Sequence, residues 1–437
     1  MKNINLGLIG FGNIGSGVVK LLKENADILE KRLGTKLILK KIVDINITSQ
    51  RSVSVDPQLL STDVNLILND PEIDIVIELV GGYDKALHYI TEALNKGKHV
   101  VTANKALLAT FGNDLFQLAD KKERNIGFEA SVGGTIPIIK TIKEGLVANR
   151  IKSILSIMNG TSNFILTKMT DDGKDFKSVL KEAQELGFAE ADPTFDIEGV
   201  DTAHKLAIVL TLAYGKRVPL NELYREGISN ISQQDVEFAG ELGYRIKLLA
   251  IARQHDEIIE ARIHPTMVPF HHLLANVNGN YNAFHIIGDA SDSVFLSGQG
   301  AGMMPTASAV VSDIIDISRD ILKGVSWRVP ARSFQEEAIK DIALMPVDEI
   351  MTHYYFRFSA LDRPGVLSKI AGILAEENIS IATVIQKGRK QGQPVPIVMI
   401  THKSKEKNVR RALEQIDKLD IVQGHTVLIR IEDDRLS

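Results

Sequence analysis

The chain has 437 residues, of which 44% are hydrophobic and 24% charged, an ordinary balance for a globular protein. This length allows about three domains of ~150 residues each. The net charge of −4 at pH 7 is small and mixed in sign, which argues against a nucleic-acid partner. The absence of cysteine excludes disulfides, thiolate metal sites and a cysteine nucleophile.

The first residues do not form a targeting signal. Asn5, Gly7 and Gly10 interrupt the apolar run that a signal peptide needs. No apolar run along the chain reaches the ~20 residues of a membrane span. We therefore expect a soluble cytoplasmic protein with no membrane partner.

Strands and helices alternate over the first 130 residues. We expect strands at 4–9, 36–45, 73–80, 98–102 and 125–130, with helices at 15–32, 84–96 and 114–124. Gly97 stands where a glycine helix cap is expected. This alternation predicts the α/β class, with a Rossmann-type, doubly wound parallel sheet.

Later segments predict further domains. Residues 131–300 mix expected helices (135–147 and 200–215) with strands (154–159 and 257–268), which indicates an α+β region. Residues 305–322 form a strong helix. Residues 323–350 are an expected connector. Residues 351–437, read over 352–434 as strand, helix, strand, strand, helix, strand, form the last domain.

A glycine-rich turn follows the first strand directly and opens a helix. It reads Gly10-Phe11-Gly12-Asn13-Ile14-Gly15. In this context the pattern is a dinucleotide fingerprint, because the glycines permit a tight turn and let a pyrophosphate approach the helix N-terminus. Thr102, at the end of a later strand, supports the same interpretation.

The sequence does not decide whether the cofactor is NAD or NADP. Asp44, near the end of the second strand, suits a ribose 2′-hydroxyl and NAD. Lys40 and Lys41 suit a 2′-phosphate and NADP. All three also fit ordinary surface charges.

A carboxylate-rich segment ends in a lysine that enters an apolar run. Five acids lie close together before Lys205: Glu190, Asp192, Asp196, Glu198 and Asp201. Asp201 and Lys205 are four residues apart and share a helix face, either as a surface ion pair or as a buried site. Because LAIVLTLA follows Lys205, we expect the buried site. Lysine there can exchange a proton with an alcohol, while Asp201 and Glu190 hold a substrate ammonium group. Asp192 and Glu198 fit caps or solvated charges better.

Lys105 follows the strand that ends at Thr102. Parallel sheets bind ligands beyond the carboxyl ends of their strands, so this lysine is a second candidate for the site.

The chain resembles homoserine dehydrogenases over nearly its whole length. The motifs that carry the resemblance are GFGNIG, TANKALL (102–108), EASVGGTIPII (129–139), NGTSNFIL (159–166), GFAEADPTFDIEGVDTAHKLAI (187–208) and GQGAGMMPTASAV (298–310). The resemblance implies reversible, NAD- or NADP-dependent interconversion of L-homoserine and L-aspartate 4-semialdehyde, within threonine and methionine synthesis. It makes residues 1–130 the nucleotide-binding domain, completed by about 300–322, and residues 131–300 the catalytic and dimerisation domain. It also implies a homodimer or homotetramer.

The resemblance assigns roles by motif. It makes Lys205 and Lys105 catalytic, and it places Glu190 and Asp201 at the substrate. Asp196, a second-rank candidate from the group of acids, and Gly187 complete the predicted substrate residues. The resemblance places the glycine turn, Thr102, Lys105 and Gly302 at the cofactor. It also implies a monovalent cation, sodium or potassium, held by Glu129, Val132, Gly134 and Ile136 mostly through carbonyl oxygens. A glycine loop kept only for tight packing is the rival explanation there.

The last domain resembles a ferredoxin-like ACT regulatory domain, carried by FRFSALDRPGVLSKIAGILAEENISI. The resemblance implies feedback inhibition by L-threonine, with Asn378 near the effector. A purely dimerising module is the alternative.

Other functions fit less well. Aspartate-semialdehyde dehydrogenase needs a cysteine nucleophile, which the chain lacks. An amino-acid dehydrogenase acting on the α-amine fits the carboxylate-rich segment poorly. A non-catalytic sensor, in which both lysines are dispensable, is the alternative from another class.

Overall fold

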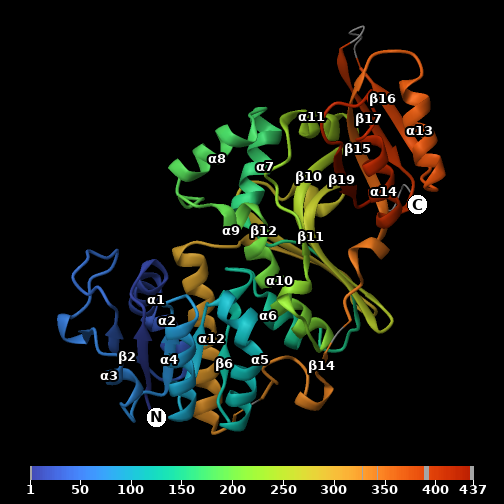
Figure 1. Ribbon diagram of the computed structural model, residues 1–437. Helices are drawn as coiled ribbons and strands as arrows, with labels where there is room; N and C mark the ends of the chain where they lie inside the picture. The colour runs from blue at the N-terminus through green and yellow to red at the C-terminus, as the bar shows by residue number, and fades with distance from the viewer. Residues whose placement is uncertain (1, 327, 342, 388–392, 434–437) are drawn as a thin grey trace. The chain divides into compact units, whose positions relative to one another are not determined.

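The computed structural model describes residues 2–326, 328–341, 343–387 and 393–433. The chain divides into two compact units, each built from three segments (Figure 1). Unit 1 comprises Met1–Ile154, Asp201–Glu222 and Tyr281–Ile342, and unit 2 comprises Leu155–Val200, Leu223–Asn280 and Ala343–Ser437. These two units are defined by contacts within the chain and do not test the domain boundaries inferred from the sequence. Those boundaries stay predictions.

Unit 1 contains a six-stranded sheet in the order β3-β2-β1-β4-β5-β6, with every pair parallel. Its strands are β1 (Ile4–Ile9), β2 (Leu37–Val43), β3 (Leu60–Ser61), β4 (Ile75–Glu78), β5 (His99–Thr102) and β6 (Ile126–Gly127). All residues of β4 and β5 are buried, as expected for strands covered on both faces. The predicted parallel sheet is confirmed.

Helices cover this sheet, and one of them comes from much later in the chain. They are α1 (Asn13–Glu24), α2 (Ala26–Leu33), α3 (Asn65–Leu68), α4 (Asp84–Asn95), α5 (Lys105–Lys121) and α12 (Met303–Lys323). Ala307, Val310 and Ile314 of α12 share a hydrophobic core with β1 and β4. A Cβ on Gly17 of α1 would lie 2.9 Å from Met303, so the two helices pack closely.

Three details differ from the sequence analysis. The helix expected at 15–32 is divided at Asn25 into α1 and α2. The helix expected at 114–124 begins at Lys105, because the Asn104 side chain caps it by accepting the Leu107 N–H at 3.1 Å. The strand expected at 125–130 has two residues and is followed by a 3₁₀ turn, Glu129–Ser131.

The rest of unit 1 includes a buried helix, α10 (Val200–Tyr214), all of which after Val200 belongs to this unit. A hairpin joins β12 (Tyr281–Gly288) to β13 (Asp292–Gln299), and β8 (Lys216–Arg217) pairs with β14 (Lys340–Asp341). The helix expected at 135–147 is a short turn, α6 (Ile138–Lys140), continued by a π-helical turn, Thr141–Gly145. Strand β7 (Ile151–Ile157) leads out of this unit.

Unit 2 is built on a long antiparallel pair, β10 (Tyr244–His255) and β11 (Ile258–Pro269). Short β9 (Tyr224–Arg225) pairs with β11. The helices of the middle segments are α7 (Gly160–Asp172), α8 (Phe176–Glu185), α9 (Thr194–Ile197) and α11 (Gln233–Glu241). Sequence patterns did not identify these helices individually.

The C-terminal segment has the predicted order of strands and helices, with one short extra strand. The elements are β15 (Met351–Leu361), α13 (Val366–Glu376), β16 (Ile381–Gln386), β17 (Pro394–Thr401), β18 (Ser404–Lys405), α14 (Glu406–Ile416) and β19 (Val427–Ile431). Its sheet order is β19-β15-β17-β16, and β19 also pairs in parallel with β11. The ACT-like segment thus shares a continuous sheet with the rest of unit 2.

Short 3₁₀ turns join several elements: Pro57–Leu59, Leu220–Glu222, Leu273–Asn276, Glu336–Ala338 and Val347–Glu349. The expected connector, 323–350, contains two of them, although positions 327 and 342 lie outside the described residues. Within the described residues, no helix combines the length and apolar character needed to cross a bilayer.

Candidate active site

The glycine turn between β1 and α1 has the geometry of a phosphate-binding loop. Gly10 has φ +99°, and a Cβ there would lie 2.6 Å from the Leu79 carbonyl group. A Cβ on Gly15 would lie 2.2 Å from the Gly10 oxygen. Gly12 caps α1 without a side chain, and the space around its missing Cβ is open. The first and third glycines are therefore required by packing, while the second leaves room for a phosphate at the helix N-terminus.

Asp44, beyond the end of β2, is held against this turn. Its Oδ2 accepts the Phe11 N–H at 2.6 Å, and its Oδ1 accepts the Asn46 N–H at 2.8 Å. Arg51 lies beside it, with Nη2 3.7 Å from Asp44 Oδ1 and the guanidinium carbon 5.7 Å from the centre of the Phe11 ring. Arg51 was not predicted from the sequence, because it lies far along the chain from the glycine turn and outside any recognisable motif.

The two lysines of β2 are engaged elsewhere. Lys40 Nζ lies 2.9 Å from an oxygen of Asp70 and 2.5 Å from one of Glu72, and these hydrogen bonds, Glu72 first, raise the pKa of Lys40. Lys41 donates to the Gln58 carbonyl at 2.8 Å. The surface-charge interpretation of these two lysines is therefore the better supported one.

Thr102 ends β5 and is fully buried. Its hydroxyl donates to Glu78 Oε2 at 2.7 Å. Because this side chain is committed to Glu78, a contact of Thr102 with the cofactor would come from its backbone. That contact stays a prediction.

Asp201 joins the two candidate lysines. Its Oδ2 accepts from Lys205 Nζ at 2.7 Å, and its Oδ1 lies 3.2 Å from Lys105 Nζ. The Lys205 and Asp201 side chains are 9% and 5% exposed, whereas Lys105 is 34% exposed. The expected burial of Asp201 and Lys205 on one face of α10 is thus observed. Residues almost a hundred positions apart meet in one ionic group, open to solvent at Lys105.

Asp201 therefore has, besides Lys205, a second partner that was not predicted from the sequence, Lys105. From the sequence, its carboxylate is expected to bind mainly the substrate ammonium group. A carboxylate offers about four acceptor positions, so Asp201 retains capacity for a further donor. A substrate contact would share this carboxylate with Lys105 and Lys205.

The other predicted substrate residues belong to unit 2. Glu190 is exposed, and Gly187 has φ +74° after α8. Asp196 Oδ1 accepts the Asn159 side-chain amide at 2.8 Å. Asp192 accepts the Thr194 N–H at 3.1 Å, as expected for a cap. The substrate roles of Glu190, Asp196 and Gly187 stay predictions.

The loop predicted to hold a cation is tightly packed. Glu129 is buried, and its carboxylate accepts the Ile139 N–H at 2.8 Å and the Lys140 N–H at 2.9 Å. Burial, followed by the nearby Asp313, raises the pKa of Glu129 to about 7. The Ile136 carbonyl accepts the Ile138 N–H at 2.8 Å. Gly134 has φ +58°, and a Cβ there would lie 2.5 Å from the Gly300 carbonyl group, which supports the packing explanation for this glycine.

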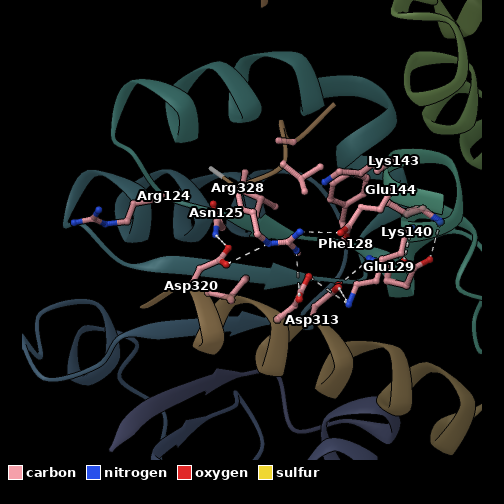
Figure 2. A pocket seen from close by; sticks show the side chains of 17 residues that line it. Arg124, Asn125, Phe128, Glu129, Lys140, Lys143, Glu144, Asp313, Asp320 and Arg328 are labelled. Atoms are coloured by element: carbon pink, nitrogen blue, oxygen red, sulfur yellow. Dashed lines mark hydrogen bonds and ion pairs between the residues drawn. The ribbon is translucent and has the colours of Figure 1, made fainter. Parts of the chain in front are cut away.

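A pocket of about 630 Å³ lies beside Glu129, partly open to solvent, between β6 and α12 (Figure 2). Charged side chains of both signs line it and pair with one another. Arg328 Nη1 lies 2.9 Å from Glu144, Asn125 donates to Asp320 at 3.0 Å, and Lys140 Nζ lies 3.8 Å from Asp313. Because these charges largely pair with one another, the pocket favours neither an anionic nor a cationic ligand.

Three family models match the chain. The model described as the NAD binding domain of homoserine dehydrogenase matches residues 10–129, and the model described as homoserine dehydrogenase matches 137–315. A model described as ACT domain matches residues 354–420. The chain belongs to the homoserine dehydrogenase family. The family, the fold class and the oxidoreductase activity predicted from the sequence are thereby confirmed.

Individual relatives agree with the family models. The homoserine dehydrogenase of Neisseria gonorrhoeae is 45% identical over 99% of each chain. The crystal structure of a homoserine dehydrogenase from Thiobacillus denitrificans is 46% identical, with a TM-score of 0.94 over 100% of this chain and 99% of that one. A hyperthermophilic archaeal homoserine dehydrogenase in complex with NADPH is 26% identical, with a TM-score of 0.61 over 75% of this chain and 100% of that one.

For this homoserine dehydrogenase, three features are therefore shown: a nicotinamide-dinucleotide-binding domain, substrate binding by the catalytic region, and an ACT domain of the kind that binds small-molecule effectors.

Proposed function

We propose that Lys205 is the proton donor when this enzyme reduces L-aspartate 4-semialdehyde to L-homoserine, and the proton acceptor in the reverse direction. The observation that carries the proposal is the ionic group of Lys205, Asp201 and Lys105. Lys205 is buried at the start of an apolar helix, and Lys105 follows the carboxyl end of β5. Parallel sheets of this type bind their ligands at that edge.

The chemistry requires one hydride and one proton. When bound, the nicotinamide supplies the hydride to the aldehyde carbon. The C=O π electrons then move to oxygen, where the Lys205 ammonium group stabilises the negative charge and donates its proton. Neutral Lys205 regains a proton from solvent, on the side where Lys105 is exposed.

Asp201 keeps two like charges together in this scheme. Without its carboxylate, the Lys105 and Lys205 ammonium groups would repel each other. We propose that Glu190 and Asp196, with the backbone of Gly187, hold the substrate ammonium group, and that Asp201 shares in this contact. The concentration of acids before Lys205 supports this assignment.

For the cofactor, we propose contacts from Gly10 to Gly15, Thr102, Lys105 and Gly302, and a preference for NADP. Arg51 supports NADP, because its guanidinium group is suited to a 2′-phosphate and lies at the Phe11 ring. Asp44 already accepts two backbone N–H groups. Gly302, at the start of α12, has φ +122° and is exposed beside α1.

We also propose that the loop of Glu129, Val132, Gly134 and Ile136 holds sodium or potassium. Carbonyl and carboxylate oxygens suit such hard cations. The Ile136 carbonyl and the Glu129 carboxylate already accept backbone N–H groups, so the carbonyls of Val132 and Gly134 would contribute most. Titrating a dialysed sample with Na⁺ and K⁺ and measuring the midpoint of thermal unfolding tests this proposal.

For regulation, we propose L-threonine as the effector of the ACT domain. The first turn of α13 follows Gly365, which provides no side-chain cap, so the N–H groups at this terminus are suited to a carboxylate. Asn378 has φ +58° just after α13, which helix termination explains by itself. Its predicted effector contact is part of this proposal.

We propose a homodimer built through the middle region, or a homotetramer in which ACT domains also pair, and a cytoplasmic location. Light scattering with and without threonine tests the first part, and fractionation of cells that express the protein tests the second.

Initial-rate kinetics test the proposed function as a whole. Homoserine oxidation is measured with NADP⁺ and NAD⁺, each with and without threonine. We expect turnover with both cofactors, a lower KM for NADP⁺, and inhibition by threonine. A protein that binds threonine but does not oxidise homoserine would instead support the sensor alternative.

A further inference from the structure

Glu78, at the carboxyl end of β4, is a buried acid that the mechanism does not use. It is fully buried. Its carboxylate accepts the Thr102 hydroxyl at 2.7 Å and the N–H groups of Val80 at 2.8 Å and Gly81 at 3.3 Å. Burial raises the pKa of Glu78, and these three donors oppose the shift by stabilising the ionised form.

The hydrogen bonds continue from Thr102 to the start of α5. Glu78 and Thr102 face each other in the parallel register of β4 and β5. The Thr102 hydroxyl oxygen accepts the Asn104 N–H at 3.0 Å. The Asn104 side chain caps α5 through the Leu107 N–H at 3.1 Å and also donates to the Gly82 carbonyl at 2.7 Å. The loops that follow two neighbouring strands are thus tied together by one buried carboxylate.

This network ends at the catalytic candidates. Lys105 is the first residue of α5, and its N–H donates to the Ala103 carbonyl at 3.0 Å. Its Nζ lies 3.2 Å from Asp201, which in turn binds Lys205 at 2.7 Å. All of these residues belong to unit 1. The direction in which Lys105 leaves the sheet edge therefore depends on the turn that Asn104 and Thr102 form.

We propose that Glu78 is a positioning residue: through Thr102 and Asn104, its carboxylate fixes the first turn of α5 and so holds Lys105 within reach of Asp201. This inference rests on the proposed function of Lys105.

The network needs an acceptor at Glu78. The Thr102 hydroxyl has one proton, which it donates to Glu78, while its oxygen accepts from Asn104. A glutamine at position 78 has a single oxygen for the Val80 and Gly81 N–H groups. Its NH₂ group would then face Thr102 as a second donor. The hydroxyl proton would lose its acceptor, and the turn before Lys105 would no longer be held in one arrangement.

A double-mutant cycle with Lys105 tests the proposal. We expect Glu78→Gln to lower kcat about tenfold in the native sequence, since small misplacements of a catalytic group are costly. The same change should alter kcat less than about twofold in the Lys105→Ala background, because Glu78 then has no catalytic group to position. Thr102→Val should lower kcat as much as Glu78→Gln does, whereas Thr102→Ser, which keeps the hydroxyl group, should lower it less.

Thr110→Val is the matched control. Thr110 lies on the same helix, and its exposed hydroxyl donates to the Ala106 carbonyl at 3.0 Å. We expect its kcat to equal that of the native enzyme. If Glu78→Gln does not fold, the difference in kcat between Thr102→Val and Thr102→Ser is sufficient to test the positioning role of Glu78.

The possible failures are distinct. If Lys105→Ala retains native kcat, the proposed role of Lys105 is wrong. If Lys105→Ala is slow and Glu78→Gln slows it by a further tenfold, Lys105 keeps its role and the positioning inference is overturned. Equal kcat for Thr102→Val and Thr102→Ser would overturn it as well.

Discussion

Each unit contains a buried ionic cluster, and the two clusters differ in composition. In unit 1, one carboxylate, Asp201, binds two lysines, one of which is partly exposed. In unit 2, Arg262 and Arg430 are completely buried among glutamates. Arg262 lies 2.9 Å from Glu432 and binds Glu260, and Arg430 binds Glu406 at 2.9 Å and Glu226 at 3.0 Å.

The residue types explain this difference. Arginine keeps its proton and binds carboxylates with a rigid, planar fork, so an Arg–Glu cluster can hold strands together but cannot transfer a proton. Lysine is a point charge that can give up a proton. The cluster of unit 2 joins β11 to the ACT-like segment, because Arg262 lies on β11 and Glu432 follows β19. We therefore interpret the lysine cluster as chemical and the arginine cluster as structural.

Replacing Lys205 should give the largest change in activity. We expect Lys205→Ala to lower kcat by about 10²–10⁴-fold, the contribution typical of a positioned acid–base group. The fold should persist, which thermal unfolding would show. Lys121→Ala, an exposed lysine of α5, is the control and should keep native kcat. Loss of the fold, with native activity in the remaining folded protein, would refute the catalytic role.

Replacing Arg262 should lower the stability of the protein rather than its activity. We expect Arg262→Ala to lower the free energy of unfolding of unit 2 by about 3–5 kcal/mol, because it leaves buried glutamates unpaired. Activity per folded molecule should remain, as measured by kinetics at a temperature below the transition. Arg411→Ala, which removes an ion pair between exposed Arg411 and partly buried Glu377, should cost at most about 1 kcal/mol.

The same cluster predicts how the ACT-like segment responds to truncation. Removing residues 350–437 would unpair β11 from β19 and remove Glu432 from Arg262. We expect this truncated enzyme to be markedly less stable than the full chain in urea unfolding. Point variants near Asn378 therefore separate regulation from stability better than truncation. Unchanged urea stability would mean that unit 2 does not depend on this shared sheet.

Replacing Asp201 should have a smaller effect than replacing Lys205. We expect Asp201→Asn to raise the KM for homoserine and to lower kcat about tenfold, because the two lysines lose their shared carboxylate. Asp192→Asn, a change in a capping acid of the same segment, is the control. If Asp201→Asn has the KM and kcat of the native enzyme, the two lysines do not need this carboxylate.

Replacing Arg51 should change cofactor choice only. We expect Arg51→Ala to lower the ratio of kcat/KM for NADP⁺ to that for NAD⁺ by about tenfold, an effect of roughly 1.4 kcal/mol. Lys41→Ala should leave this ratio unchanged. An unchanged ratio in Arg51→Ala, together with a lower ratio in Lys41→Ala, would assign the 2′-phosphate to Lys41 of β2 instead.

Acid should weaken the arginine cluster. Burial raises the pKa of Glu432, but Arg253 and Arg262 outweigh it and hold this pKa below its ordinary value of 4.5. Such a group contributes stability above its unfolded pKa and loses it as pH falls through the folded, lower value. We expect the unfolding free energy of unit 2 to fall below about pH 4.5, with a weaker dependence in Glu432→Gln.

Local patterns predicted the parts of the site that lie close together in the sequence. The glycine turn and the pair of Asp201 and Lys205 were found, because a turn and a helix face depend on neighbouring residues. The contact of Lys105 with Asp201 was not predicted, since it joins residues almost a hundred positions apart. Glu78 could have been noticed as an acid at the end of an apolar strand, whereas Arg51 gave no comparable signal.

Prediction of the fold has the same limit, because it also depends on contacts between segments that are distant in the sequence. The parallel sheet and the C-terminal order of elements follow from alternation along the chain. The shared pairing of β11 and β19 does not, because it joins segments more than 150 residues apart. The helix expected at 114–124 begins earlier, at Lys105, because Asn104 caps it there.

The most direct test of proton transfer by Lys205 is the single-turnover rate of Lys205→Arg with saturating NADPH and L-aspartate 4-semialdehyde. Arginine preserves the positive charge beside Asp201 but does not release its proton at neutral pH. We expect a folded enzyme that oxidises NADPH at least about 100-fold more slowly than the native enzyme. A native rate would contradict the account, because charge alone would then be sufficient.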